Sequence, residues 1–303
     1  MQSLEPAILR TVAYFDLFSY PLTAWEIWKW LFTEPMQPNV SYADVCETLQ
    51  HLPALECQYG LYFLKGHGAN VATRQTRYRL ALHKFKRARR YAKVLARLPF
   101  VRAVAVCNSL GLANARPESD IDLFIVAKPG HVWTTRLFAA GWAQLRKLRP
   151  QRENRADTVC LSFFITEDVG DLTIVRNPVD PYFTVWLATL VPLYDPQARF
   201  ATLWKKNAWI TQALPRALPR GLAHPHAITP SFLQAWVEAC FVGSWFEQWA
   251  ERFQQQRLPQ QLRVLVNRDT RVVLNRTMLK FHDNDRREEY AQRFQQACSS
   301  LGV

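Results

Sequence analysis

The sequence predicts a mixed α/β (α+β) fold with a small mixed sheet in the middle third and helical regions on either side. Three observations support this prediction. Strand-like apolar runs recur between residues 100 and 166, and helical patterns occupy much of the first 70 residues. From residue 181 onward the pattern is again helical, and prolines separate the helical segments. The 303 residues are 49% hydrophobic, which provides a core and excludes disorder over most of the length. We expect three domains, over residues 1–70, 71–178 and 179–303.

The first 70 residues predict three short helices and a terminal hairpin, which is the order of a winged helix-turn-helix. Apolar residues recur at helical spacing near the N-terminus, and two capping-box pairs open the next helices, namely Thr23 with Glu26 and Ser41 with Asp44. In helix-turn-helix proteins the second helix of the motif enters the major groove with cations. Here that helix, residues 41–52, has two acids and no Lys or Arg. We therefore expect this winged-helix-like domain to serve in packing or protein contacts, without sequence-specific DNA recognition.

The net charge of +13 is concentrated in one part of the chain. No Asp or Glu occurs between Glu56 and Glu118, an interval with thirteen Lys and Arg residues, whereas the remaining sequence has 25 residues of each sign. A helix is predicted over residues 74–98, and the spacing of its cations places five of them on one broad face: Arg79, Lys86, Arg90, Lys93 and Arg97. This face is either solvated surface or a binding surface for a polyanion, such as tRNA or another RNA, or the triphosphate of a nearby nucleotide.

The middle third contains the pattern with the clearest chemistry. It predicts a helix over 132–148 and three strands, over residues 101–106, 121–126 and 158–166. Asp120 and Asp122 point to the same face of the second strand, because side chains alternate along a strand. Two neighbouring carboxylates repel each other, and a divalent cation would relieve that repulsion. Ser109 ends the first strand in a turn whose backbone N–H groups can face a phosphate. A solvated strand end is the alternative interpretation of the two acids.

These residues resemble the signature of the DNA polymerase β-like nucleotidyltransferase superfamily, in which a small-residue turn is followed, after about ten residues, by acid–apolar–acid–apolar. The matching positions are Cys107, Asn108 and Ser109, then Asp120, Ile121, Asp122 and Leu123. Asn108 stands where the family has Gly, and Asn tolerates the left-handed backbone better than most residues. The wider arrangement resembles a group of largely uncharacterised bacterial nucleotidyltransferase-domain proteins that have a winged-helix-like segment before the core. That second resemblance rests on Ala7–Phe32, Phe100–Val126, Cys160–Phe164 and Lys280–Arg287.

The resemblance implies a transferase that moves a nucleoside monophosphate, with AMP from ATP as the expected case, to an acceptor on a small molecule, a protein or RNA, with release of pyrophosphate. Asp120 and Asp122 would hold Mg²⁺ or Mn²⁺. Family members usually add a third carboxylate from a following strand, and the strand predicted here has none. Asp157, just before it, is our candidate for that role, ahead of Glu167 and Asp168. The alternative is an inactive or weakly active module of this fold that binds a nucleotide, RNA or a protein partner.

Further candidate contacts follow from the same comparison. Asn108 and Ser109 would approach the nucleotide, Ser119 would bond a phosphate or cap a turn, and Arg136 would reach the triphosphate or lie on the surface. The segment after residue 280 would contact substrate through His282, Asp283, Asp285 and Arg286. Its alternative role is to cap a helix, because Asp285 with Glu288 is a capping pattern for a last helix over 286–301.

The compartment is expected to be cytoplasmic. The six cysteines are scattered and form no CxxC pair, which argues against a zinc site and against a disulfide framework. Residues 1–20 lack a basic start followed by an apolar run, so no signal peptide is visible. The longest apolar stretch, residues 182–194, is too short to span a bilayer, so we expect no membrane partner.

Overall fold

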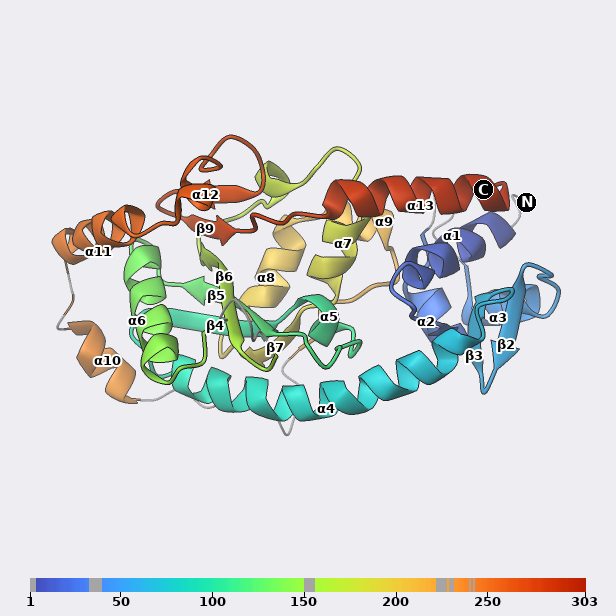
Figure 1. The fold of residues 1–303 in the computed structure, drawn as a ribbon, viewed down its shortest axis with the longest axis horizontal. Coiled ribbons are helices and arrows are strands. Elements are labelled where there is room, and N and C mark those ends of the chain that lie inside the picture. Colours follow the sequence, from blue (N-terminus) through green and yellow to red (C-terminus); the bar gives the residue numbers. More distant parts are fainter. Residues whose placement is uncertain are drawn as a thin grey trace.

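A computed structural model describes residues 4–32, 40–149, 156–221, 228, 232–239, 241 and 243–303, and it has a mixed α/β fold with two separate sheets (Figure 1). A three-stranded sheet lies with three helices at one end of an elongated molecule, and a six-stranded sheet covered by helices lies at the other. The predicted α/β class is therefore confirmed. Within the described ranges, no helix is both long enough and apolar enough to cross a membrane.

The N-terminal end contains the three helices and the hairpin that the sequence predicts. Its helices and strands are α1 (Glu5–Asp16), β1 (Leu22–Thr23), α2 (Ala24–Lys29), α3 (Tyr42–Leu49), β2 (Leu55–Gln58) and β3 (Leu61–Leu64). Both capping boxes are present: the hydroxyls of Thr23 and Ser41 accept hydrogen bonds from the backbone N–H of Glu26 and Asp44. β3 lies between β1 and β2, and both pairings are antiparallel.

The six-stranded sheet has the order β7-β4-β5-β6-β9-β8, and only β5 and β6 are parallel. Its strands are β4 (Val101–Val106), β5 (Ile121–Ala127), β6 (Val159–Thr166), β7 (Val191–Tyr194), β8 (Val272–Leu274) and β9 (Met278–Phe281). The first three are the predicted strands, each within a residue. The purely helical expectation for residues 179–303 is wrong, because β7, β8 and β9 come from this part of the chain. Three- and four-residue strands are too short for side-chain alternation to reveal them.

The two faces of this sheet carry different helices. One face, with Phe124 and Phe163, packs against α7 (Pro181–Ala188) and α8 (Arg199–Lys206). The other, with Leu123 and Phe164, packs against α4 (Ala69–Leu95), α6 (Val132–Leu145) and α11 (Ser244–Gln256). Because side chains alternate along β5, Asp122 lies on the same face as Phe124 and α7. The shorter elements are α5 (Asn108–Gly111), η1 (Thr173–Val175), α9 (Trp209–Ala213), α10 (Phe232–Ala239) and α12 (Gln260–Arg263).

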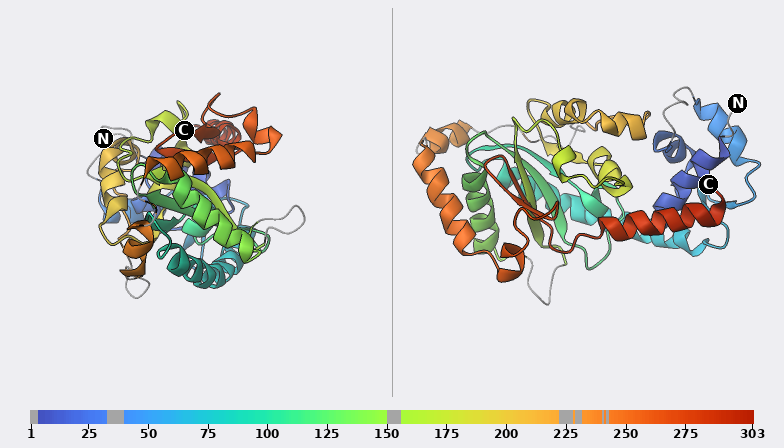
Figure 2. Two further views of the ribbon diagram at one scale, coloured as in Figure 1. Left: turned by 90° about the vertical axis from the view of Figure 1, so that its left-hand side faces the viewer. Right: turned by 90° about the horizontal axis from the view of Figure 1, so that it is seen from above.

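Two long helices connect the ends of the molecule. α4 is the predicted basic helix, although it begins earlier and ends earlier than expected, and it runs from β3 along the lower edge in Figure 1 to the six-stranded sheet. α13 (Arg287–Leu301) starts beside the sheet and packs against α1 at the N-terminal end (Figure 2), where Phe294 lies 5.7 Å from Tyr14 between ring centroids. The C-terminal helix therefore returns to the first helix of the chain.

Candidate nucleotide and metal site

Asp120 and Asp122 stand at the start of β5 and face the neighbouring strand β6. Asp122 is the direct register partner of Cys160, and the two strands run parallel. The carboxylate oxygens of the two acids and the sulfur of Cys160 all lie within 4.8 Å of one another. Among the described residues, this is the cluster of acid, Cys or His side chains whose geometry could hold a metal ion.

The carboxylate of Asp122 is in an environment that disfavours its charge. Burial, and then the neighbouring charge of Asp120, raise its pKa to about 7. Hydrogen bonds from the side chains of Asn108 and Cys160 act in the opposite direction and stabilise the ionised form. A divalent cation between the two carboxylates would remove the repulsion and offset the desolvation. Two carboxylates are a suitable donor set for Mg²⁺ or Mn²⁺, and the thiol adds a softer donor.

Asn108 connects the turn after β4 to the acids. Its φ is +55°, the left-handed conformation that Asn tolerates, so the turn forms without a Gly at this position. The side-chain oxygen of Asn108 accepts a hydrogen bond from the Tyr182 hydroxyl at 3.4 Å, and its amide bonds Asp122. Tyr182 in turn stacks on Tyr290, with ring centroids 5.2 Å apart. Asn108 thus holds Asp122 in a fixed relation to α7 and α13.

Two adjoining cavities open beside this turn. The larger, of about 280 Å³, is polar and cationic, and its wall includes Ser109, Ser119, Arg77, Arg116 and Arg286. The smaller, of about 170 Å³, has aromatic walls from Phe163, Trp186 and Tyr290 and polar groups from Lys280 and His282. The cavities share Asn108, Tyr182, Trp186, Arg286 and Tyr290. The structure therefore brings the predicted Asn108, Ser109, Ser119, His282, Asp285 and Arg286 around one continuous region.

Asp157 does not join the carboxylate pair. Its carboxylate forms ion pairs with Lys84 (2.9 Å) and Arg87 (2.6 Å) of α4, and it is absent from the cluster of Asp120, Asp122 and Cys160. Lys84 is almost fully buried, and it also donates to the carbonyl oxygens of Pro117 and Ser119. Asp157 therefore fixes the loop before β5 to α4. The residue that faces Asp122 from β6 is a thiol.

Arg136 lies away from the acids. It belongs to α6, which covers the face of the sheet opposite to Asp122. Its guanidinium donates to the side-chain oxygen of Gln254 at 2.6 Å and lies 4.2 Å from the ring centroid of Phe281. Burial lowers its pKa to about 9. These contacts indicate a role in packing α6 against α11 and β9.

The predicted substrate segment divides into residues that reach the smaller cavity and one that does not. His282 contacts Ser162, with 3.1 Å between Nε2 and Oγ, and burial lowers its pKa to about 3, with Lys280 as the next cause. The ring is therefore neutral near pH 7. Arg286 lines both cavities and forms a bidentate pair with Glu289. Asp283 is exposed, and its carboxylate accepts from the N–H of Asn284.

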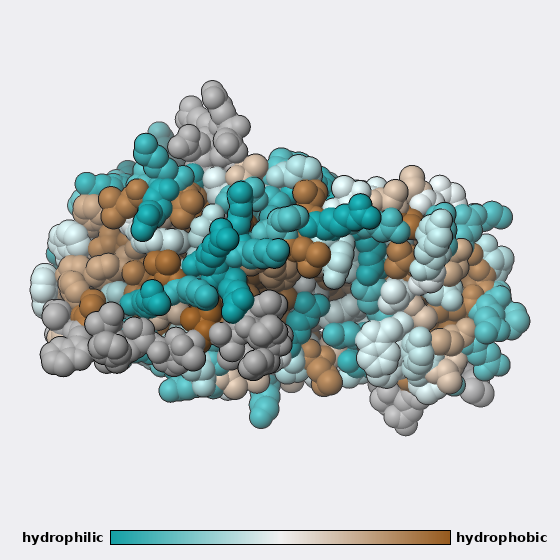
Figure 3. Space-filling model, turned by 90° about the horizontal axis from the view of Figure 1, so that it is seen from below, coloured by the Kyte–Doolittle hydropathy of each residue, from teal (hydrophilic) through white to brown (hydrophobic). Residues whose placement is uncertain are grey.

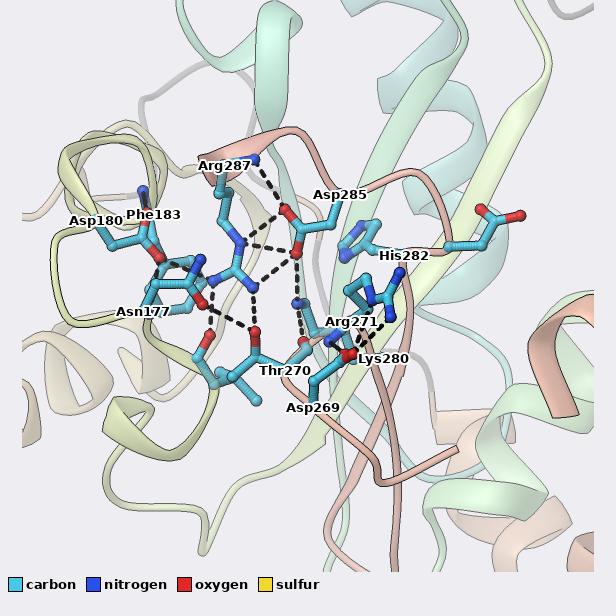
Figure 4. A network of polar contacts seen from close by, with 12 residues as sticks. Asn177, Asp180, Phe183, Asp269, Thr270, Arg271, Lys280, His282, Asp285 and Arg287 are labelled. Atoms are coloured by element: carbon cyan, nitrogen blue, oxygen red, sulfur yellow. Dashed lines mark hydrogen bonds and ion pairs between the residues drawn. The ribbon is translucent and has the colours of Figure 1, made fainter. Parts of the chain in front are cut away.

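The expected cap by Asp285 and Glu288 is wrong. No side chain caps α13, which starts at Arg287, because the carboxylate of Asp285 instead accepts the Arg287 guanidinium and backbone N–H. Figure 4 shows Arg287 between Asp285 and Asp180, with a further bond from its guanidinium to the Thr270 hydroxyl at 2.7 Å. Lys280 lies 3.6 Å from Asp285, and burial lowers its pKa to about 8, with Arg287 as the next cause. This buried network holds the wall of the smaller cavity.

Sequence reasoning missed several residues that line the site. Arg77 and Arg116 belong to the acid-free interval, but its charge alone does not separate cations that face the cavity from those that face solvent. Tyr182 follows an Asp-Pro pair that caps α7, and this pair was a usable signal for a helix start. Trp186 is 5% exposed and lines both cavities.

Comparisons of the chain with protein-family models, with curated proteins and with solved structures find no match.

Proposed function

We propose that the chain is a Mg²⁺-dependent nucleotidyltransferase that transfers a nucleoside monophosphate, with AMP from ATP as the expected case, to an acceptor hydroxyl. One observation carries the proposal. Two acids that disfavour each other's charge, Asp120 and Asp122, stand beside the Asn108–Ser109 turn, and both residues of this turn line a cationic cavity. This combination suits a metal-bound triphosphate.

The residues of the chain have distinct tasks in this proposal. Asp120 and Asp122 would hold Mg²⁺ or Mn²⁺, which would neutralise charge on the triphosphate and on the departing pyrophosphate. Arg77 and Arg116 place positive charge in the wall of the larger cavity, where phosphate oxygens would lie. Asn108 positions Asp122 through its side-chain hydrogen bond. In the proposed reaction, the acceptor oxygen would bond the α-phosphorus and the bond from that phosphorus to the oxygen that bridges to the β-phosphate would break. Pyrophosphate would leave with that oxygen, and the proton of the acceptor hydroxyl would pass to solvent water or to the pyrophosphate.

A second candidate, a nucleotide-binding module without turnover, is favoured by the side chain that faces Asp122 from β6. Cys160 occupies this position, and Asp157 is committed to Lys84 and Arg87. Without a third carboxylate, the acceptor hydroxyl has no obvious proton acceptor, whereas binding of a metal and a triphosphate needs only the first two acids. The two candidates therefore share a site and differ in the chemical step.

The experiment that tests both uses each NTP labelled at the α-phosphate, with Mg²⁺ or Mn²⁺ and a cell extract as the source of acceptors. We expect label transfer from ATP by the wild-type chain, loss of transfer in Asp122→Asn, and retention in the control Asp168→Asn, which removes an exposed acid just after β6. Metal-dependent NTP binding without transfer would select the binding module. Absence of both transfer and binding would reject both candidates.

A further inference from the structure

The exposed side of α4 carries a row of cations without an ion-pair partner among the described residues. At about 100° per residue, Arg79, Lys86, Arg90 and Lys93 lie within about 60° of one another around the helix axis, and Arg97 follows in the next turn of the chain. All five are exposed, and none forms an ion pair with a residue that the structure describes. We call these five residues the α4 stripe.

Four other cations of this helix have structural partners. Arg74 pairs with Glu26, Lys84 and Arg87 pair with Asp157, and Arg77 donates to the carbonyl oxygen of Phe18 at 2.7 Å. The acid-free interval therefore contains two populations of cations. One holds α4 to its neighbours, and the other, the α4 stripe, faces solvent on the side opposite to the buried Ala81, Ala88 and Ala92. Figure 3, which views the molecule from the side of α4, shows hydrophilic side chains gathered across this surface.

The spacing within the α4 stripe disfavours an isolated helix. Lys86 and Arg90 are four residues apart and Arg90 and Lys93 three, so like charges are neighbours on the helix surface and destabilise it. A face that serves only solubility normally combines both signs, and within the described residues this one contains no acid. A polyanion bound along the stripe would convert this repulsion into attraction. From Arg79 to Lys93 the helix rises about 21 Å, which matches about six nucleotides of a stacked strand.

A groove leads from α4 to the candidate site. It has a volume of about 670 Å³ and is lined by Thr73, Thr76 and Leu80 of α4 and by Arg116, Pro117 and the acid Glu118 of the opposite loop. Arg77 also lines this groove, and Arg77 and Arg116 both line the larger cavity beside Ser109. At about 100° per residue, Arg77 lies about 160° around the helix axis from Arg79, so a strand held on the α4 stripe must turn around α4 before its end passes over these two arginines toward the acids. Tyr78, 52% exposed, offers a ring on which an unpaired base can stack.

We propose that the α4 stripe binds the phosphate backbone of a single-stranded RNA and presents its end to the cavity at Ser109, where the terminal ribose hydroxyls are the acceptor. The binding surface is independent of the chemistry at Asp122, whereas the role of RNA as acceptor rests on the proposed function. RNA fits better than duplex DNA, because α3 has no cations for a groove and α4 has an exposed aromatic ring beside its cations.

The first test measures RNA binding without nucleotide or metal. A fluorescent single-stranded RNA of about 20 nucleotides is titrated with the full chain over a range of KCl concentrations. The stripe variant Lys86→Gln, Arg90→Gln, Lys93→Gln should bind at least about tenfold more weakly, with a salt slope smaller by about 2, because each lost contact removes about 0.7 from the slope. A matched control makes the same charge change elsewhere on the exposed surface and should bind as the wild type does: Lys205→Gln, Arg252→Gln, Arg268→Gln.

Several outcomes would contradict the proposal that the α4 stripe is an RNA-binding surface. These are unchanged binding by the stripe variant, an equal loss in the control, or equal affinity for single-stranded DNA or for vesicles containing phosphatidylserine. Asp122→Asn should bind RNA as tightly as the wild type does. A second test supplies the same RNA with α-phosphate-labelled ATP and Mg²⁺. Transfer of label to RNA, lost in the stripe variant, supports the acceptor role. RNA binding together with transfer only to other acceptors would overturn that role and leave the transferase proposal standing.

Discussion

At the scale of single residues, Asp122 combines a cost to folding with a candidate function. Burial and Asp120 raise its pKa from 3.8 to about 7, so between these values the folded chain binds more protons than the unfolded chain. Stability is therefore highest below about pH 4 as far as this group is concerned, and it falls as the pH rises toward 7. Each unit of difference corresponds to about 1.4 kcal/mol. A structural role alone would not favour such an arrangement.

Asp122→Asn should consequently stabilise the metal-free chain at neutral pH. The amide keeps an oxygen that can accept the hydrogen bonds from Asn108 and Cys160 and has no charge to desolvate. Urea denaturation in EDTA should give a free energy of unfolding higher by about 1–3 kcal/mol at pH 7, with the difference from wild type disappearing toward pH 4. The same variant should lose the increase in Tm that Mg²⁺ gives the wild type. A variant less stable than wild type at pH 7 would contradict this account of the acid pair.

A substitution at Cys160 tests the acid pair from the neighbouring strand. It is the direct register partner of Asp122 on β6, so Cys160→Asp places a third carboxylate beside the first two. Without metal, three neighbouring carboxylates should lower Tm by several degrees relative to wild type. With Mg²⁺ the order should reverse, and half-saturation should need about tenfold less Mg²⁺. Cys160→Ser is the control for the loss of the thiol. Equal Mg²⁺ dependence in both variants would show that residue 160 does not face the ion.

The residues of the site were predictable to the extent that their roles depend on local sequence. The spacing from Asn108 to Asp122 specifies a turn, a strand and two acids on one face, and each of these is present. The ion pairs of Asp157 were not predictable, because its partners Lys84 and Arg87 are more than 60 residues away and sequence proximity to β6 does not reveal them. The aromatic residues Tyr182, Trp186 and Tyr290 of the cavity walls come from α7 and α13, and only the tertiary fold brings these helices to the turn.

At the scale of elements, α4 acts as a support for the strand that carries the acids. Lys84, 3% exposed, donates to the carbonyl oxygens of Pro117 and Ser119 and to the carboxylate of Asp157. The backbone N–H of Asp157 donates to the Ser119 carbonyl as well. The loop before β5 and the start of β6 are thus held on one buried cation, and this fixes where β5 begins and where Asp120 lies.

Asp157→Asn tests this structural interpretation. Loss of the carboxylate leaves the buried ammonium of Lys84 with only carbonyl oxygens, so the free energy of unfolding should fall by about 1–3 kcal/mol. The Mg²⁺ concentration that half-saturates the chain should remain that of wild type. Asp168→Asn, an exposed acid on the far end of β6, serves as the control with little change in either quantity. A large loss of Mg²⁺ affinity in Asp157→Asn alone would restore Asp157 as a ligand.

Elements with a complete local pattern were predicted well, and elements that depend on distant pairing were not. α3, with its capping box, and β5, with its alternation, have their signals within their own residues. β9 has four residues and pairs with β6 on one side and β8 on the other, so its formation depends on a sheet built from segments more than 100 residues earlier. The start of α13 differs from the predicted capping pattern for a related reason. Arg287 bonds Asp180 of α7, and this contact, more than a cap, determines the conformation before the helix.

At the scale of the whole molecule, the net charge of +13 divides into structural and exposed cations. Arg74, Arg77, Lys84 and Arg87 tie α4 to the N-terminal end and to the loop before β5. The α4 stripe faces solvent. Composition detects the excess and its interval, but the division depends on which side of α4 packs against the sheet, and that follows from the positions of its alanines. The same helix therefore serves stability on one side and recognition, in our proposal, on the other.

α13 joins the N-terminal end to the candidate site. Phe294 contacts Tyr14 and Phe32, and one turn earlier Tyr290 contacts Phe18 and stacks on Tyr182, which bonds Asn108. A change in the packing of α13 on α1 should therefore be felt at the cavity. This continuity argues that the N-terminal end supports the site and does not act as a separate unit attached by a linker.

Phe294→Ala tests this dependence. The loss of a partly buried ring between Tyr14 and Phe32 should cost about 2 kcal/mol and raise hydrogen exchange in α1 while β4 and β5 remain protected. Phe253→Ala removes a ring that stacks on Trp249 at the opposite end of the molecule, so it should lower stability without raising exchange in α1. NTP affinity should fall in Phe294→Ala and not in Phe253→Ala. The reason is that α13, the helix of Phe294, contributes to the cavity walls, whereas α11, the helix of Phe253, does not. Equal affinities in the two variants would mean that the site functions independently of the N-terminal end.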